Sequence, residues 1–216
     1  LSHWPFGGSD TPYTANPDSR EFVKMLLDHG ADVNAQTDSG SSPLHFAAER
    51  SSNDVTLLLA EHGADLRVPG ILATAAQHDS EAVARLLTEL GIGVNDLDGA
   101  GWSPLHRAAQ TNSLRVAGLL IEQGANVNAQ LEHIVAVKSW DYGNTPMHYA
   151  VQRGHESFVR LLIDHGANVN LTNNAGYTPL AGINSSISPS LDNRPFLNIG
   201  DLLIEHGATT EGMSCR

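Results

Sequence analysis

Basic residues are scarce in this chain. It has 12 Lys and Arg against 24 Asp and Glu, which gives a formal net charge of −12. Non-specific binding to a phosphate backbone needs clustered Lys and Arg, so this balance argues against nucleic acid as a partner. The same charge disfavours acidic partners and anionic membrane surfaces.

Cysteine is nearly absent, and targeting signals are lacking too. The single Cys215 makes no internal disulfide, which suits a reducing compartment, and we expect an intracellular protein, cytoplasmic or nuclear. No apolar run is long enough for membrane insertion, and no charged-then-apolar leader is present. Because the chain starts with Leu1 rather than Met, we expect it to be an excised or processed segment.

What the sequence does contain is a repeated pattern. The stretch "SPLHFAAERSSNDVTLLLAEHGADL" from Ser42 returns as "SPLHRAAQTNSLRVAGLLIEQGANV" from Ser103 and "TPMHYAVQRGHESFVRLLIDHGANV" from Thr145. A glycine closes each leucine-rich stretch, at Gly30, Gly63, Gly91, Gly124, Gly166 and Gly207. The gaps between these glycines are 33, 28, 33, 42 and 41 residues, which indicates a 33-residue unit with local deletions and insertions.

Each unit is predicted to form two helices and an extended loop. Ser42 suits an N-cap and Pro43 the first helical position, where its missing N–H costs nothing. The small pair Ala47 and Ala48 lets neighbouring helices approach closely. Gly63 provides a left-handed C-cap for the second helix. Because one unit cannot bury both of its helices, the units are expected to stack on one another.

The unit is similar to the ankyrin repeat, whose pattern has a T-P-L-H-x-A-A stretch, a G-A-D-V-N-A tail and a period of 33. The similarity runs from Thr11 to Thr209 and implies an all-α ankyrin-repeat solenoid of about six helix–turn–helix units with β-hairpin-like finger loops. The expected units are 11–32, 33–65, 66–93, 94–126, 127–168 and 169–209. Residues 1–10 form a leader or cap, and 210–216 a tail.

Three units depart from the pattern. The third lacks five residues before Ala75, so a notch is expected in the row of fingers, either for recognition or as ordinary packing. The fifth gains "LEHIVAVKSW" before Asp141, which either lengthens a finger that contacts a partner or folds onto adjacent helices. The sixth carries eight extra residues within "AGINSSISPSLDNRPFLNIGD", whose Ser, Asn and Pro content indicates a surface loop.

The histidines and carboxylates do not form a recognisable catalytic or metal-binding pattern. His45, His106 and His148 occupy one slot of the repeat, where the resemblance implies a structural hydrogen bond between adjacent turns. Carboxylates before the closing glycines are expected to form a solvated ridge. The chain has no nucleophile elbow, phosphate loop or dinucleotide fingerprint. We therefore predict no catalytic, metal or cofactor site, and not an enzyme.

Recognition is the predicted function, on the residues that the resemblance places along the concave face and fingers. Trp and Tyr in this set are frequent interface anchors. The predicted partner-binding residues are Ser41, Glu49, Arg50, Gln77, His78, Trp102, Gln110, Thr111, Trp140, Asp141, Tyr142, Asn144, Gln152, Arg153 and Tyr177.

We expect a monomer that binds another protein or an extended peptide with basic residues, which the acidic charge would attract. Two alternatives stay open. One is a small-molecule-binding or enzymatic role in a pocket near the third unit and the fifth finger. The other is a targeting module of a larger protein.

Overall fold

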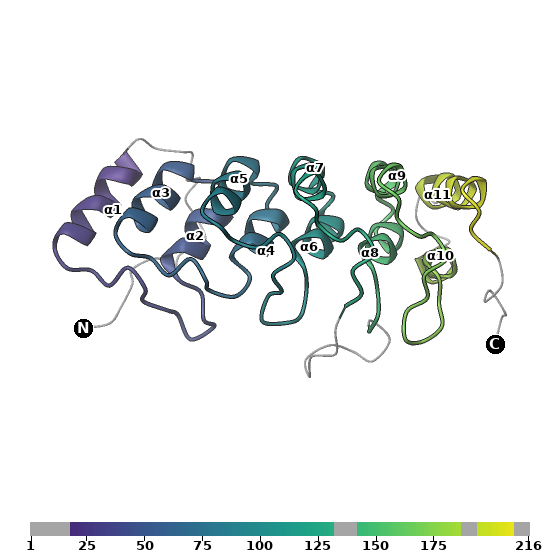
Figure 1. Ribbon diagram of the computed structural model, residues 1–216, viewed down its shortest axis with the longest axis horizontal. Coiled ribbons are helices and arrows are strands. Elements are labelled where there is room, and N and C mark those ends of the chain that lie inside the picture. Colours follow the sequence, from purple (N-terminus) through teal and green to yellow (C-terminus); the bar gives the residue numbers. More distant parts are fainter. Residues whose placement is uncertain (1–17, 132–141, 187–193, 210–216) are drawn as a thin grey trace.

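The computed structural model describes residues 18–131, 142–186 and 194–209. Across these residues the chain forms eleven helices and no strand. The helices stack into an elongated solenoid with residues 18–28 and 194–205 at opposite ends (Figure 1). The predicted all-α repeat architecture is therefore confirmed.

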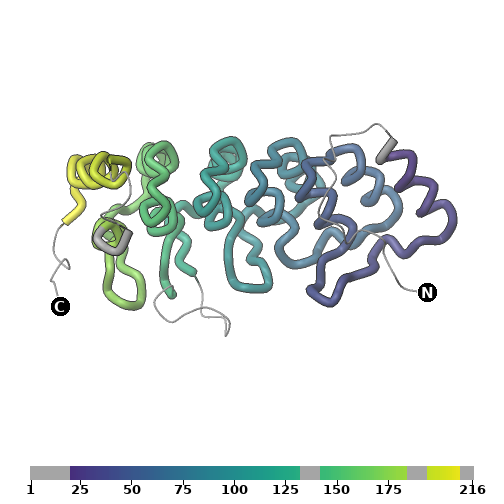
Figure 2. The backbone as a smooth tube through the Cα atoms, turned by 180° about the vertical axis from the view of Figure 1, so that it is seen from behind, coloured from purple at the N-terminus to yellow at the C-terminus, as the bar shows by residue number. Residues whose placement is uncertain are grey.

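The helices lie in two parallel rows, which are visible from both sides of the molecule (Figures 1 and 2). The inner row, from whose side the loops project, consists of α2 (Pro43–Glu49), α4 (Ile71–Gln77), α6 (Pro104–Thr111), α8 (Pro146–Gln152) and α10 (Pro179–Ser186). The outer row consists of α1 (Asp18–Asp28), α3 (Asn53–Glu61), α5 (Glu81–Glu89), α7 (Leu114–Glu122), α9 (Glu156–Asp164) and α11 (Arg194–Glu205). Each helix contacts its neighbours along its own row and its partner in the other row.

Local sequence explains where the helices begin and end. Ser103 has extended dihedral angles and its Oγ accepts the backbone N–H of His106 at 3.3 Å, while Pro104 fills the first helical position. The outer helices end at glycines that have positive φ, such as Gly124 at +88°. This left-handed conformation is favourable for glycine and turns the chain towards the next unit.

The core lies between the two rows and between successive units. Ala48, Ala76 and Ala109, which follow one another along the inner row, are fully buried and let the helix backbones approach. Leucines of the outer row fill the space behind them, and Leu87 and Leu120 are also fully buried. Because every unit covers the next, the core runs the length of the solenoid.

The fingers are hairpin-like turns closed by backbone hydrogen bonds, although none of the described residues is assigned to a strand. In the fourth unit the N–H of Asp98 donates to the carbonyl of Trp102 at 2.9 Å. The second and sixth fingers close in the same way. In the third unit, α4 begins directly after Pro69 and Gly70, with no such hairpin before it. Most of the insertion of the fifth unit (132–141) and part of that of the sixth (187–193) lie outside the described residues.

Candidate functional site

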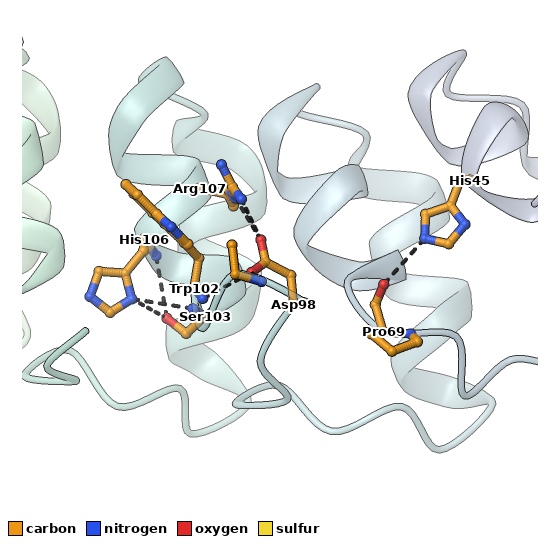
Figure 3. Close-up of polar contacts among 8 residues, drawn as sticks. His45, Pro69, Asp98, Trp102, Ser103, His106 and Arg107 are labelled. Carbon is orange, nitrogen blue, oxygen red and sulfur yellow. Dashed lines mark hydrogen bonds and ion pairs between the residues drawn. The ribbon is translucent and has the colours of Figure 1, made fainter. Parts of the chain in front are cut away.

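Three equivalent histidines, one each on α2, α6 and α8, join their helix to the loop of the following unit. In each, Nδ1 accepts the backbone N–H of the N-cap residue, as from Ser103 to His106 at 3.3 Å (Figure 3). The ring therefore carries its hydrogen on Nε2, which donates to a carbonyl of the next unit. The acceptors are the carbonyls of Pro69, Asn144 and Tyr177, at 3.3, 3.0 and 2.9 Å from His45, His106 and His148.

Burial keeps these rings neutral. Desolvation lowers the pKa of His106 and of His148 to about 4, although the hydrogen bonds to backbone carbonyls oppose the shift. The pKa of His45 is lowered for the same reason. The predicted structural role of this histidine slot is therefore confirmed, because each ring is committed to two hydrogen bonds.

The fourth finger is held by a single carboxylate. Asp98 Oδ1 accepts the backbone N–H groups of Ala100 and Trp102 at 2.9 and 3.0 Å. Its Oδ2 accepts from Nε of Arg107 at 2.8 Å and from Nη2 at 2.5 Å (Figure 3). Both side chains are largely shielded from solvent, which favours this charge-assisted pair. The finger is thereby fixed to helix α6.

Trp102 packs inside the fourth finger. Its ring lies 4.5 Å from that of Tyr149 in the next unit, with the edge of His106 at 6.1 Å. The guanidinium of Arg107 lies over the ring at 4.6 Å from its centroid. Only 8% of Trp102 is exposed, so the structure gives this residue a packing role. Its placement argues against the partner contact that the sequence suggested.

The predicted residues after the alanine slots do form one continuous feature. They stand fourteen and thirteen residues before a closing glycine, at the C-terminal ends of α2, α4, α6 and α8. Two of them are half-buried and six are exposed. We call this set the inner-helix stripe: Glu49, Arg50, Gln77, His78, Gln110, Thr111, Gln152 and Arg153.

The predicted finger residues have different environments. Tyr177 is 52% exposed, whereas Ser41 and Tyr142 are half-buried. Asn144 is fully buried, and its Oδ1 accepts from Asn173 Nδ2 at 2.8 Å. Burial of Asn144 therefore argues against partner contact, as it does for Trp102. Trp140 and Asp141 lie outside the described residues.

Sequence reasoning missed the residue that follows the histidine slot. This position carries Phe46 in α2, which is 39% exposed, and Thr74 and Arg107 in the next two inner helices. The sequence did contain a signal for this position. It is the x of the P-L-H-x-A pattern, and the residues found there in four units differ in size and charge. Phe46 adds an apolar group near the start of the inner-helix stripe.

The missing third finger leaves a small pocket beside the stripe. Its volume is about 230 Å³, and it is lined by residues of α4 such as Thr74 and Gln77 and by Asp98 and Arg107 across from them. Ligand pockets for drug-sized molecules span about 300–1,000 Å³. This pocket is below that range and is closer in size to one side chain of a partner.

Within the part of the chain that the structure describes, no group of three or more His, Cys, Asp and Glu side chains is placed to hold a metal ion. The carboxylates before the closing glycines, such as Glu61 and Glu122, are exposed on the outer row. No helix among the described residues is long and apolar enough to cross a membrane.

Comparison with known proteins gives matches along most of the chain. The family model for three copies of the ankyrin repeat matches residues 13–70 and 69–130, and the model for one ankyrin repeat matches residues 142–174. An ankyrin repeat protein of Fowlpox virus (strain NVSL) is 40% identical over 114 residues, 51% of this chain and 26% of that protein. Neurogenic locus notch homolog protein 2 of Homo sapiens and of Mus musculus is 32% identical over 118 residues, 50% of this chain and 5% of theirs.

Proposed function

Because the chain belongs to the ankyrin repeat family, whose members generally serve as protein–protein interaction modules, we propose that it is a non-catalytic module that binds a partner protein or an extended peptide. The contact surface is the inner-helix stripe together with the adjoining fingers. Tyr142 and Tyr177, on the adjoining fingers, belong to this proposed surface. Trp140 and Asp141, which lie outside the described residues, stay predicted contacts.

The observation that carries this proposal is the inner-helix stripe itself. Its side chains differ from unit to unit, yet they project from equivalent positions of four stacked helices whose opposite faces are buried. The backbone beneath them is tied by the histidine hydrogen bonds of three units. A partner that binds such a surface orders few groups, so little conformational entropy opposes binding.

Composition of the stripe favours recognition of an extended segment. Gln77, Gln110 and Gln152 place a carboxamide on three successive inner helices. A carboxamide has one acceptor and two donors, and those of Gln77 and Gln110 match the N–H and C=O groups of a peptide backbone. The net charge of −12 attracts a segment that carries basic residues and speeds its encounter.

The test is affinity capture from native extract followed by calorimetric titration of the purified captured protein. The test variant is Gln77→Ala/Gln110→Ala. The matched control is Glu61→Gln/Glu122→Gln, which changes exposed residues of the outer row. We expect the stripe variant to bind at least about tenfold more weakly, which corresponds to about 1.4 kcal/mol. The outer-row control should bind as the unchanged protein does.

Equal affinity of the unchanged protein and the stripe variant would contradict the proposed surface. Loss of binding in the outer-row variant alone would place the contact on the other row. Circular dichroism of both variants establishes that they are folded before binding is compared.

A further inference from the structure

Asparagines tie the loops of neighbouring units together at most junctions. Asn34 Nδ2 donates to the carbonyl of Gly63 at 3.2 Å, and Asn34 Oδ1 accepts the N–H of Asp65 at 2.7 Å. Three later asparagines make equivalent bonds to the next loop along the solenoid. They are Asn95, to Gly124 and Asn126; Asn128, to Asn168; and Asn170, to Gly207 and Thr209.

The junction between the third and fourth units is built differently. Arg67 stands where the other units have asparagine. The backbone N–H of Gly93, which would be the partner of that asparagine, donates instead to Oδ2 of Asp96 at 3.0 Å. A Cβ on Gly93 would lie 2.5 Å from Oδ1 of Asp96, so a larger residue there would displace the carboxylate from its present position. The donor is therefore satisfied within its own loop, and the two loops are not joined through it.

A second tie is also replaced at this junction. Ala73 occupies the histidine slot of the third unit, so α4 has no imidazole to bond the fourth finger. The two units are in contact instead through their helices and through Asp79, whose carboxylate accepts from Arg115 Nε at 2.8 Å and from the N–H of Val116 at 3.1 Å. The stack is thus held on the side away from the loops.

The separated loops enclose an opening with a volume of about 470 Å³. We call it the third-loop opening, lined by residues 66–72, 91–92 and 96–97. Its volume falls within the range of ligand sites, and its lining combines the apolar side chains of Leu66, Ile92 and Leu97 with the charged side chains of Arg67 and Asp96. Leu97 is 37% exposed, and glutamine occupies its position in the second and fifth units.

Another apolar residue stands next to the opening. Leu90 directly precedes the lining residue Gly91 and is 41% exposed, where four other units have histidine. Two exposed leucines, Leu90 and Leu97, thus replace polar residues within this one junction. Of the two, Leu97 lines the opening and gives it an exposed apolar group where the second and fifth units have glutamine.

We propose that the third-loop opening binds a large apolar side chain of an extended segment of a partner protein. This inference rests on the proposed function, because the segment is the one that lies on the inner-helix stripe. Pro69 and Gly70 line both the opening and the 230 Å³ pocket beside Gln77. A segment on the stripe reaches the opening by crossing the finger row where the third finger is missing.

Charge at the rim adds a second recognition element. Arg67 and Asp96 are exposed and line the opening, and Asp65, also exposed, directly precedes the lining residue Leu66. Arg67 is anchored through its backbone N–H, which donates to Asp65 Oδ1 at 2.9 Å. The two carboxylates outnumber the one guanidinium, so the segment carries a basic residue next to its apolar anchor.

The experiment uses a displayed library of random twelve-residue peptides, selected on the full chain. Affinities of a selected peptide are then measured by fluorescence anisotropy. The main variant is Leu97→Gln, which installs the residue that the second and fifth units already carry. The matched control is Leu57→Gln, since Leu57 is 39% exposed on α3 and lies away from the opening. Gln77→Ala/Gln110→Ala reports separately on the stripe.

We expect selected peptides to share an apolar anchor, and Leu97→Gln to weaken binding at least about tenfold while Leu57→Gln leaves it unchanged. Replacing the peptide anchor with alanine should weaken binding to the unchanged protein and have little further effect on Leu97→Gln. Arg67→Asn, which restores the residue that ties other loops together, should weaken binding as well.

Unchanged affinity of Leu97→Gln would overturn the inference. If the stripe variant alone then lost the peptide, the proposed function would stand and only the opening would be misassigned. If no peptide bound at micromolar concentration, both would fail. Sedimentation equilibrium tests whether the free chain dimerises. A dimer that Leu97→Gln abolishes would show that a second copy of the chain occupies the opening, and it would also overturn the inference.

Discussion

Mild acid should destabilise the solenoid through two buried histidines. His106 and His148 have a pKa of about 4 in the folded chain against an ordinary value of 6.5. Both are neutral at pH 7, where their Nε2 groups donate to the next unit. Because the folded pKa lies below the unfolded one, their contribution to stability is complete above pH 6.5 and is lost as the pH falls towards 4.

The size of the effect follows from proton linkage. At pH 5.5 an unfolded imidazole is about 90% protonated, whereas the buried ring is almost entirely neutral. The free energy of unfolding should therefore fall by about 1.4 kcal/mol for each histidine between pH 7.5 and pH 5.5, or about 3 kcal/mol for both. Burial lowers the pKa of His45 and of His155 as well, so their contributions have the same sign.

The assay is urea unfolding followed by circular dichroism at pH 7.5, 6.5 and 5.5. His148→Asn removes one titrating group, so its loss of stability over the same interval should be smaller by about 1.4 kcal/mol. A free energy of unfolding that stays constant or rises between pH 7.5 and 5.5 would refute the reasoning. So would a variant whose pH dependence equals that of the unchanged chain.

Three substitutions test the packing of the solenoid. Asp79→Ala should lower the free energy of unfolding by about 1–3 kcal/mol because the N–H of Val116 loses its acceptor, and Asp79→Asn, which keeps an oxygen, should cost less in the same urea titration. Phe158→Ala should cost about 3–5 kcal/mol because this fully buried ring leaves a cavity, seen as a lower unfolding midpoint. Gly143→Ala should cost about 2 kcal/mol or more in thermal unfolding, since φ is +76° and the added Cβ would lie 2.8 Å from the backbone nitrogen of Asn174; an unchanged midpoint would contradict it.

The fold could be predicted from the sequence because identical positions repeat at fixed intervals. Ser103 and Pro104 start a helix through their own capping and backbone preferences, and Gly124 ends one because it accepts a positive φ. The residues of each unit therefore predict where its helices begin and end. The buried faces follow from the same repetition, since Ala109 is buried by the residues of the next copy. Stacking depends on contacts between adjacent repeats, and the residues that make these contacts recur at the same positions in each repeat of the sequence.

The environment of the finger residues could not be predicted in this way. Trp102 and Tyr177 occupy the same slot, yet one is 8% and the other 52% exposed. The difference arises because Tyr149, 47 residues further along the chain, places its ring against Trp102. Whether a finger residue is covered by a ring depends on the residue that follows the histidine slot in the next unit. That residue varies between units, and no local pattern predicts it.

Read in the sequence alone, the third unit resembles a degraded repeat, with a missing finger, Ala73 in place of histidine and Arg67 in place of asparagine. A repeat that had merely decayed would leave the backbone partners of those side chains unsatisfied, at a cost of about 1–3 kcal/mol for each group that is also buried. The N–H of Gly93 is instead bonded to Asp96, and the absence of a side chain at Gly93 is what makes room for that carboxylate. The third unit has therefore exchanged a bond between two loops for a bond within one loop, so the loss of the asparagine does not leave the N–H of Gly93 without an acceptor.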